Sequence, residues 1–140
     1  MKILVPVDGS ESAQRAVDYV VRLAKQGAQL QLDLLNVQIP IVSGDIRRFV
    51  SQAMIDHYHQ EEAEKALQGA KSLLDRSGVT YNATALCGHI AETIAQYVSN
   101  HACDAIVMGT RGMGPIKNLV LGSVATQVVH AANVPVTLVK

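Results

Sequence analysis

Short apolar runs alternate with segments of helical spacing along the whole chain, and this alternation is the feature that most constrains its fold. Five runs rich in Ile, Leu and Val are typical of buried strands: Lys2–Val7, Leu30–Val37, Val79–Cys87, Asp104–Met108 and Val134–Val139. Four segments between them carry apolar residues at helical spacing and begin near Ser10, Ser51, Ile90 and Gly122. This order predicts an α/β fold, a three-layer sandwich whose parallel sheet has helices on both faces and right-handed crossovers.

The ends of these segments carry the expected start and stop residues. Ser10 or Ser12 is suited to cap the first helix, and Gly27 to end it. Gly78 ends the long helix that precedes the third strand. Pro6 lacks a backbone N–H, so we place it near the carboxyl end of the first strand.

The stretch from Ile39 to Ser51 does not follow the alternation of apolar runs and helical segments. It contains Pro40 and the pair Ser43-Gly44, which favour a long loop that can include one helical turn. Such a loop is the segment best suited to act as a lid or to contact a partner.

Size and charge limit the possible partners. The 140 residues predict one domain, residues 1–140, and the 12 basic residues balance the 12 acidic ones. No overall field would therefore attract nucleic acid or an anionic membrane. The apolar runs are shorter than the roughly 20 residues of a membrane span, and the N-terminus has the pattern of a strand instead of a signal peptide. We expect a cytoplasmic protein without nucleic-acid or membrane partners.

The cysteines and histidines form no metal-spaced set. Cys87 and Cys103 each lie at the boundary of an apolar segment, which predicts small buried thiols and no disulfide in a reducing compartment. His57 and His59 are two positions apart, and on a helix they point in different directions. A shared metal ion is therefore not expected.

The fourth strand runs into a loop marked by glycines. Gly109, Gly112 and Gly122 are followed by Ser123, in the spacing Gly-x2-Gly-x9-Gly-Ser. Glycine permits positive φ and lets an anion approach backbone N–H groups. Gly122-Ser123-Val124 opens a helix, whose unpaired N–H groups and positive dipole end favour a phosphate. The alternative is a simple turn followed by a serine N-cap.

The charges in this loop suit an anion. Arg111 and Lys117 are the charged residues between Gly109 and Ser123, and both are cationic. The loop lacks the G-x-x-x-x-G-K-[ST] motif of P-loop NTPases, and Gly109-x-x-Gly112-x-Gly114 runs opposite to the dinucleotide fingerprint.

The strand order of a doubly wound sheet indicates the same region independently. Ligands bind outside the carboxyl ends of the strands, at the point where the strand order reverses. The residues there are Pro6, Val7 and Asp8 after the first strand, Asn36 and Val37 after the second, and Met108 and Gly109 after the fourth. For Asp8 alone, capping of the following helix is the competing interpretation.

Three motifs together resemble the universal stress protein family, in its ATP-binding branch. They are the glycine motif, Val-Pro-Val-Asp-Gly-Ser near the N-terminus and Ala-Asn-Val-Pro-Val near the C-terminus, and the resemblance covers essentially the whole chain. It implies the strand order 3-2-1-4-5. It also implies that Asp8 and the backbone of Val37 contact an adenine, in a pocket shaped by Pro6 and Val7.

The resemblance further implies where the rest of the ligand lies. ATP, or ADP or AMP, would carry Mg²⁺ or Mn²⁺ on its phosphate oxygens. The residues that would hold its ribose and phosphates are Gly109, Arg111, Gly112, Gly122, Ser123 and Val124.

The fifth strand predicts a partner surface. At a sheet edge its unpaired backbone groups need a cover, and a second copy across a two-fold axis would supply one. The family resemblance implies such homodimers. The strand residues involved are Val136, Thr137, Leu138 and Val139.

Catalytic groupings are not evident in the sequence. We find no Ser/His/Asp or Cys/His set, no H-E-x-x-H motif and no acid–base pair near the glycine loop. Phosphoryl transfer needs a residue that orients water or an acceptor, as well as a charge clamp. The sequence thus favours a stress-responsive ATP-binding sensor or regulator. A slow ATP hydrolase or nucleotidyl transferase, and an interaction module without nucleotide, are the alternatives.

Overall fold

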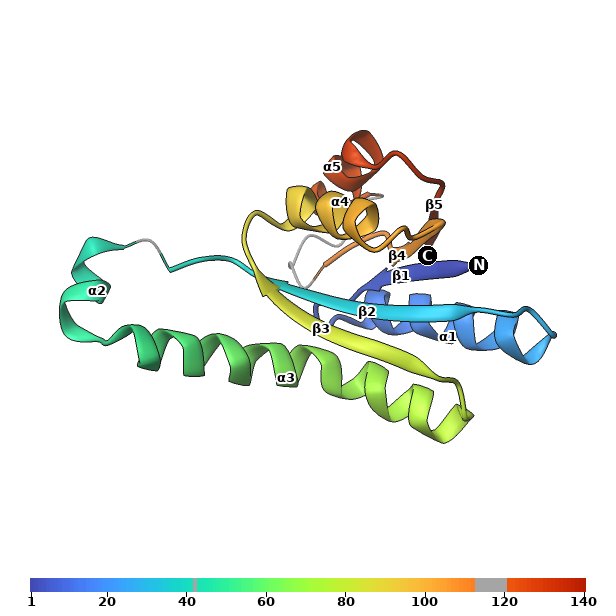
Figure 1. The fold of residues 1–140 in the computed structure, drawn as a ribbon, viewed down its shortest axis with the longest axis horizontal. Coiled ribbons are helices and arrows are strands. Elements are labelled where there is room, and N and C mark those ends of the chain that lie inside the picture. The colour runs from blue at the N-terminus through green and yellow to red at the C-terminus, as the bar shows by residue number, and fades with distance from the viewer. Residues whose placement is uncertain (42, 113–120) are drawn as a thin grey trace.

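The computed structural model describes residues 1–41, 43–112 and 121–140, and of Arg47 it describes the backbone. Its elements in chain order are shown in Figure 1. They are β1 (Lys2–Pro6), α1 (Glu11–Lys25), β2 (Gln31–Gln38), α2 (Gly44–Phe49), α3 (Gln52–Ser77), β3 (Tyr81–Cys87), α4 (Ile90–Asn100), β4 (Ala105–Gly109), α5 (Ser123–Ala131) and β5 (Val136–Val139).

The strands form one parallel sheet in the order β3-β2-β1-β4-β5, which confirms the predicted α/β fold and strand order. The chain adds β2 and β3 on one side of β1 and then returns to add β4 and β5 on the other. The strand order therefore reverses between β1 and β4. β3 and β5 are the two edge strands.

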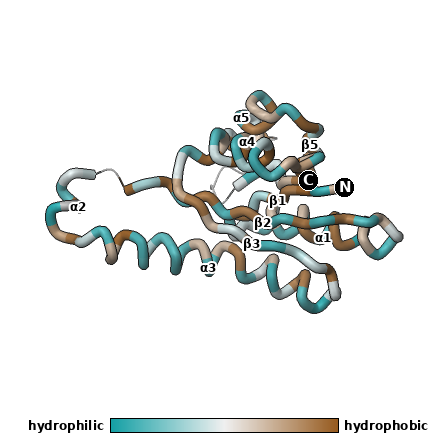
Figure 2. The backbone as a smooth tube through the Cα atoms, in the orientation of Figure 1, coloured by the Kyte–Doolittle hydropathy of each residue, from teal (hydrophilic) through white to brown (hydrophobic). Residues whose placement is uncertain are grey.

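Helices cover both faces of the sheet. Ile3, Leu4 and Val5 are all buried, and their side chains alternate between the two faces. Ile3 and Val5 belong to the core under α1 and α3, and Leu4 belongs to the core under α4 and α5. In Figure 2, β1 is largely brown, whereas α3 alternates between teal and brown as expected of an amphipathic outer helix.

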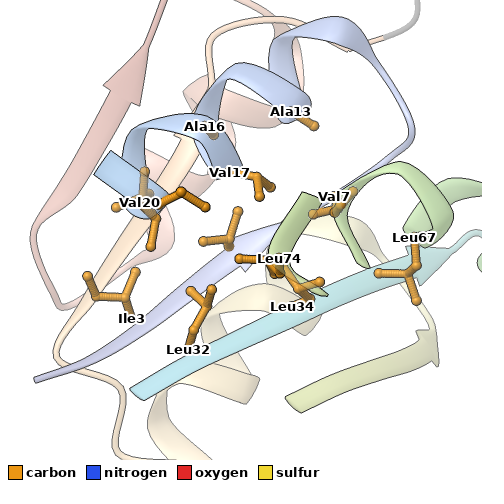
Figure 3. Packing of buried hydrophobic residues seen from close by; sticks show 14 residues of the cluster. Ile3, Val7, Ala13, Ala16, Val17, Val20, Leu32, Leu34, Leu67 and Leu74 are labelled. Carbon is orange, nitrogen blue, oxygen red and sulfur yellow. The ribbon is translucent and has the colours of Figure 1, made fainter. Parts of the chain in front are cut away.

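The core beneath α1 and α3 follows from helical spacing. Figure 3 shows Val17 and Val20 of α1 directed at the sheet, with Leu74 of α3 beside Leu34 of β2. All four side chains are fully buried. Each such side chain contributes about 1.5–3 kcal/mol when it leaves water. This packing holds the N-terminus of α1 against the carboxyl ends of β1 and β4.

The predicted helix ends are confirmed where the structure describes them. Ser10 is the N-cap of α1, and its Oγ accepts a hydrogen bond from the backbone N–H of Ala13 at 3.1 Å. Ser12, the other candidate cap, is instead the second residue of the helix. Gly78 ends α3 with a φ of +70°, a conformation that favours glycine. Pro6 is the last residue of β1, as predicted.

Some boundaries differ from those predicted. Gly44–Phe49 forms a six-residue helix, longer than the single turn expected in that loop. β3 begins at Tyr81 because the N–H of Val79 bonds to the carbonyl of Leu74 and completes the end of α3. β5 begins after Pro135, whose carbonyl accepts from Ile106 but whose nitrogen has no hydrogen to donate.

The prediction of two buried thiols is half wrong. Cys103 is buried at 5% exposure, whereas Cys87 is exposed. Cys87 ends the edge strand β3, on which Asn82, Ala83 and Leu86 are exposed as well. An edge strand has one neighbour fewer than a central strand, and its apolar pattern alone does not bury its end.

Within the described residues, no helix is both long enough and apolar enough to cross a bilayer.

Candidate functional site

A cavity of about 740 Å³ opens at the carboxyl ends of β1, β2 and β4, where the strand order reverses. Its size is typical of small-molecule sites. All the site residues predicted from the sequence lie in its lining: Pro6, Val7, Asp8, Val37, Met108, Gly109, Arg111, Gly112, Gly122, Ser123 and Val124. The fold thus brings together segments that are more than one hundred residues apart in the chain.

Part of the lining is apolar and comes from both strands and a helix. Pro6 ends β1 and Val7 follows it. Val37 belongs to β2, and Ile90 and Ile94 belong to the N-terminal half of α4. Ile94 is 1% exposed and is fixed in the core. These surfaces suit a flat, apolar ring. The two α4 residues were not predicted, because only the packing of α4 over the sheet brings them to the strand ends.

The turn between β1 and α1 presents a carboxylate to the cavity. Oδ1 of Asp8 accepts a hydrogen bond from the backbone N–H of Ser10 at 2.9 Å. Asp8 therefore stabilises the turn, while Ser10 caps the helix. Gly9, between them, has a φ of +85° and lies against Ala66 of α3, a conformation and a contact that favour glycine. Asp8 itself is exposed and carries a second oxygen, Oδ2, near Gly112.

Asn36 ties two strand ends together beneath the cavity. Its Nδ2 donates to the carbonyl of Val7 at 2.8 Å, and its Oδ1 accepts from Nε2 of Gln38 at 2.8 Å. Asn36 is 2% exposed, and its bond to Val7 is buried, whereas its bond to Gln38 is partly buried. Sequence reasoning placed Asn36 at the strand end but not in the site. A lone amide inside an apolar run was the available signal.

Gly109 serves close packing more directly than it serves an anion. A Cβ on Gly109 would overlap Oγ of Ser12 and would lie 2.6 and 2.7 Å from the backbone C and O of Ser12. Ser12 also bonds to the loop, since its Oγ accepts from the N–H of Arg111 at 3.2 Å. Gly109, Gly112 and Gly122 do not have a positive φ, so what glycine supplies at these positions is the missing Cβ.

The start of α5 closes the loop. The N–H of Gly122 bonds to the carbonyl of Thr110 at 2.6 Å, and a Cβ there would lie 3.2 Å from that oxygen. Gly122 is the N-cap of α5 and Ser123 is its first residue, so Ser123 does not cap the helix. The Ser123 hydroxyl is exposed at the cavity. The free N–H groups of this first turn form a potential anion site beside it.

Both signs of charge line the cavity. Arg111 from the loop and Arg15 from α1 are the cations, and Asp8 and Glu11 are the anions among the described residues. Arg15 was not predicted because it lies one turn into α1, away from any motif. Lys117 and Gly114, which the sequence placed in the loop, lie outside the described residues. In the part of the chain that is described, no group of three or more His, Cys, Asp or Glu residues could hold a metal ion.

The sequence profile of the universal stress protein family matches residues 1–140. The chain belongs to this family. Among curated relatives, a universal stress protein of Thermus aquaticus is 35% identical, with 99% of this chain and 97% of the relative covered. Universal stress protein MJ0531 of Methanocaldococcus jannaschii is 32% identical, with 99% of this chain and 81% of the relative covered.

Solved structures share the fold. The protein MJ0577 of Methanocaldococcus jannaschii superposes with a TM-score of 0.83 at 29% identity, over 99% of this chain and 94% of that one. A universal stress protein solved in complex with cAMP has a TM-score of 0.71 at 23% identity, over 100% and 97% of the two chains. An Arabidopsis thaliana family member solved with AMP bound has a TM-score of 0.69 at 19% identity, over 100% and 91%. The last two likenesses concern the fold alone.

Proposed function

We propose that this universal stress protein binds an adenine nucleotide, with ATP as the first candidate, and acts as a stress-responsive sensor or regulator. The observation that carries the proposal is the composition of one cavity. An apolar wall, an acceptor carboxylate and the N-terminus of a helix line the same 740 Å³ space. A nucleotide has an apolar ring, hydroxyl and amino donors, and phosphates that match these three features.

The base fits the apolar part of the lining. Val7 follows β1, Val37 lies near the end of β2, and Ile90 is the first residue of α4. All three line the cavity with apolar side chains. Asp8 would accept from amino or hydroxyl groups, because an ionised carboxylate has oxygens but no hydrogen to donate. A carboxylate repels a phosphate, so we assign Asp8 to the base and ribose and not to the phosphates.

The phosphates fit the opposite part. The first turn of α5 offers N–H groups and the positive end of its dipole, and the exposed Ser123 hydroxyl lies beside them. Gly112 has no side chain between the loop backbone and the cavity, and the Asp8 carboxylate beside it is at the end of an exposed side chain. Arg111 is exposed at the cavity and supplies the positive charge. The cAMP and AMP complexes of distant family members agree with a nucleotide on this fold.

Isothermal titration with Mg-ATP, Mg-ADP and AMP tests the proposal. We expect saturable heat with at least one of them. Arg111→Gln should raise the Kd by about ten- to a hundredfold, since a hydrogen bond to a charged group contributes about 1.5–3 kcal/mol. Arg48→Gln is the matched control, because Arg48 is an exposed arginine of α2 outside the cavity lining. The absence of saturable heat with all three nucleotides would contradict the proposal.

We also propose that the protein forms a homodimer through β5. This strand ends the sheet, and Val136, Leu138 and Val139 are only half-buried in the single chain. Pairing of β5 with a second copy would satisfy its outer backbone groups and cover these side chains. Light scattering at micromolar concentration should give twice the monomer mass, and a monomer mass there would contradict the dimer.

A further inference from the structure

A thiol and an imidazole from different elements meet at the far edge of the sheet. Sγ of Cys87, the last residue of β3, lies 3.9 Å from Nδ1 of His59 on α3. These residues are 28 positions apart in sequence. Neither lines the nucleotide cavity.

The environment of His59 indicates which nitrogen carries its proton. Nε2 is buried and has no hydrogen-bond partner among the described residues. A buried N–H without an acceptor is rarer and costlier than a buried acceptor without a donor. We therefore assign a ring hydrogen to Nδ1, the nitrogen that lies 3.9 Å from the sulfur of Cys87.

The chain's other thiol has the opposite environment. Cys103 is 5% exposed, and desolvation by burial raises its pKa, with the carboxylate of Asp33 adding to the effect. Its thiol is held neutral and away from solvent reagents. Cys87 is exposed and faces a donor. Reactive cysteines combine exposure with a nearby polar or charged group, and of the two cysteines Cys87 is the one that is exposed, with an imidazole nitrogen 3.9 Å from its sulfur.

We propose that Cys87 is a site of oxidation by hydroperoxides, in which the Nδ1–H of His59 stabilises the thiolate. The thiol first gives its proton to water. The thiolate then attacks one oxygen of the peroxide, so that an S–O bond forms and the O–O bond breaks. The other oxygen leaves as hydroxide or alkoxide and takes a proton from water. Sulfur is oxidised to a sulfenic acid, and the peroxide is reduced to water or an alcohol.

The test uses the full chain, reduced and then treated with hydrogen peroxide in the presence of dimedone, which traps sulfenic acids. Peptide mass analysis follows the labelling rates of both cysteines. We expect Cys87 to be labelled and Cys103 to remain unlabelled. In urea the two rates should move in opposite directions, because Cys87 loses its donor while Cys103 becomes exposed.

Variants of α3 test the role of the imidazole. His59→Phe keeps a ring but removes the donor, and should slow labelling of Cys87 by about tenfold. His59→Gln retains an N–H and should restore part of the rate. His57→Phe is the matched control, since His57 is exposed on the same helix and contacts Glu61 instead, at 2.9 Å. The labelling rate of Cys87 in this variant should match the rate in the wild type.

Two results would overturn the proposal. One is labelling of Cys87 that is no faster in the folded protein than in urea, a comparison that needs no variant. The other is an unchanged labelling rate in His59→Phe while Cys103 stays unlabelled, which would show that the fold is intact. Nucleotide titration is independent of both results.

Discussion

Replacing Gly109 by alanine is expected to destabilise the protein by about 3 kcal/mol or more, at the upper end of overpacking effects. The added methyl would lie 2.6 Å from the backbone carbon of Ser12 and 2.7 Å from its backbone oxygen. Backbone atoms at the start of α1 cannot rotate away, so α1 would have to shift from β4. Urea denaturation followed by circular dichroism measures the change.

Two further variants isolate the cause. Gly44→Ala adds the same methyl where nothing lies within 4 Å, and should leave stability close to that of the wild type. Ser12→Ala in the Gly109→Ala chain removes the hydroxyl but not the backbone contacts, and should not restore stability. A Gly109→Ala protein as stable as the Gly44→Ala control would show that α1 and β4 are packed less closely than in this structure.

The fold could be predicted because its signals are local. Ile3, Leu4 and Val5 are consecutive apolar residues, and a strand covered on both faces buries all of them. Ser10 and Gly78 mark helix ends through contacts with residues three or four positions away. The strand order itself came from the family resemblance, since alternation predicts a parallel sheet but not the sequence of its strands.

The sequence predicted which residues line the candidate site better than it predicted what each residue does there. The motif identified Gly109, but its contact with Ser12 joins residues 97 positions apart and depends on how closely α1 approaches β4. Arg15 belongs to no sequence motif. It lines the cavity because of where α1 packs, which a motif does not reveal. The pairing of Cys87 with His59 likewise depends on the path of α3 across an edge strand. Such contacts arise from tertiary packing, which spacing along the chain does not record.

Gly112→Val is expected to weaken nucleotide binding by about ten- to a hundredfold while leaving the free energy of unfolding nearly unchanged. A Cβ on Gly112 meets a single neighbour, Oδ2 of Asp8 at 3.0 Å, which is the end of an exposed side chain that can rotate. The valine methyls would extend from the loop into the cavity, where we place the ribose and phosphates of the proposed nucleotide. Loss of one hydrogen bond to a charged group, about 1.5–3 kcal/mol, gives the expected factor.

The affinity for Mg-ATP and the free energy of unfolding must be measured on the same preparation. The substitution should lower the affinity and leave the free energy of unfolding nearly unchanged. Gly44→Val is the matched control: it introduces the same side chain on α2, outside the cavity lining, and should bind as the wild type does. Gly109→Ala should mainly lower the free energy of unfolding, whereas Gly112→Val should lower only the affinity for the nucleotide. Unchanged affinity in a stably folded Gly112→Val protein would place the phosphates away from this loop, because side-chain bulk beside a bound anion must displace it.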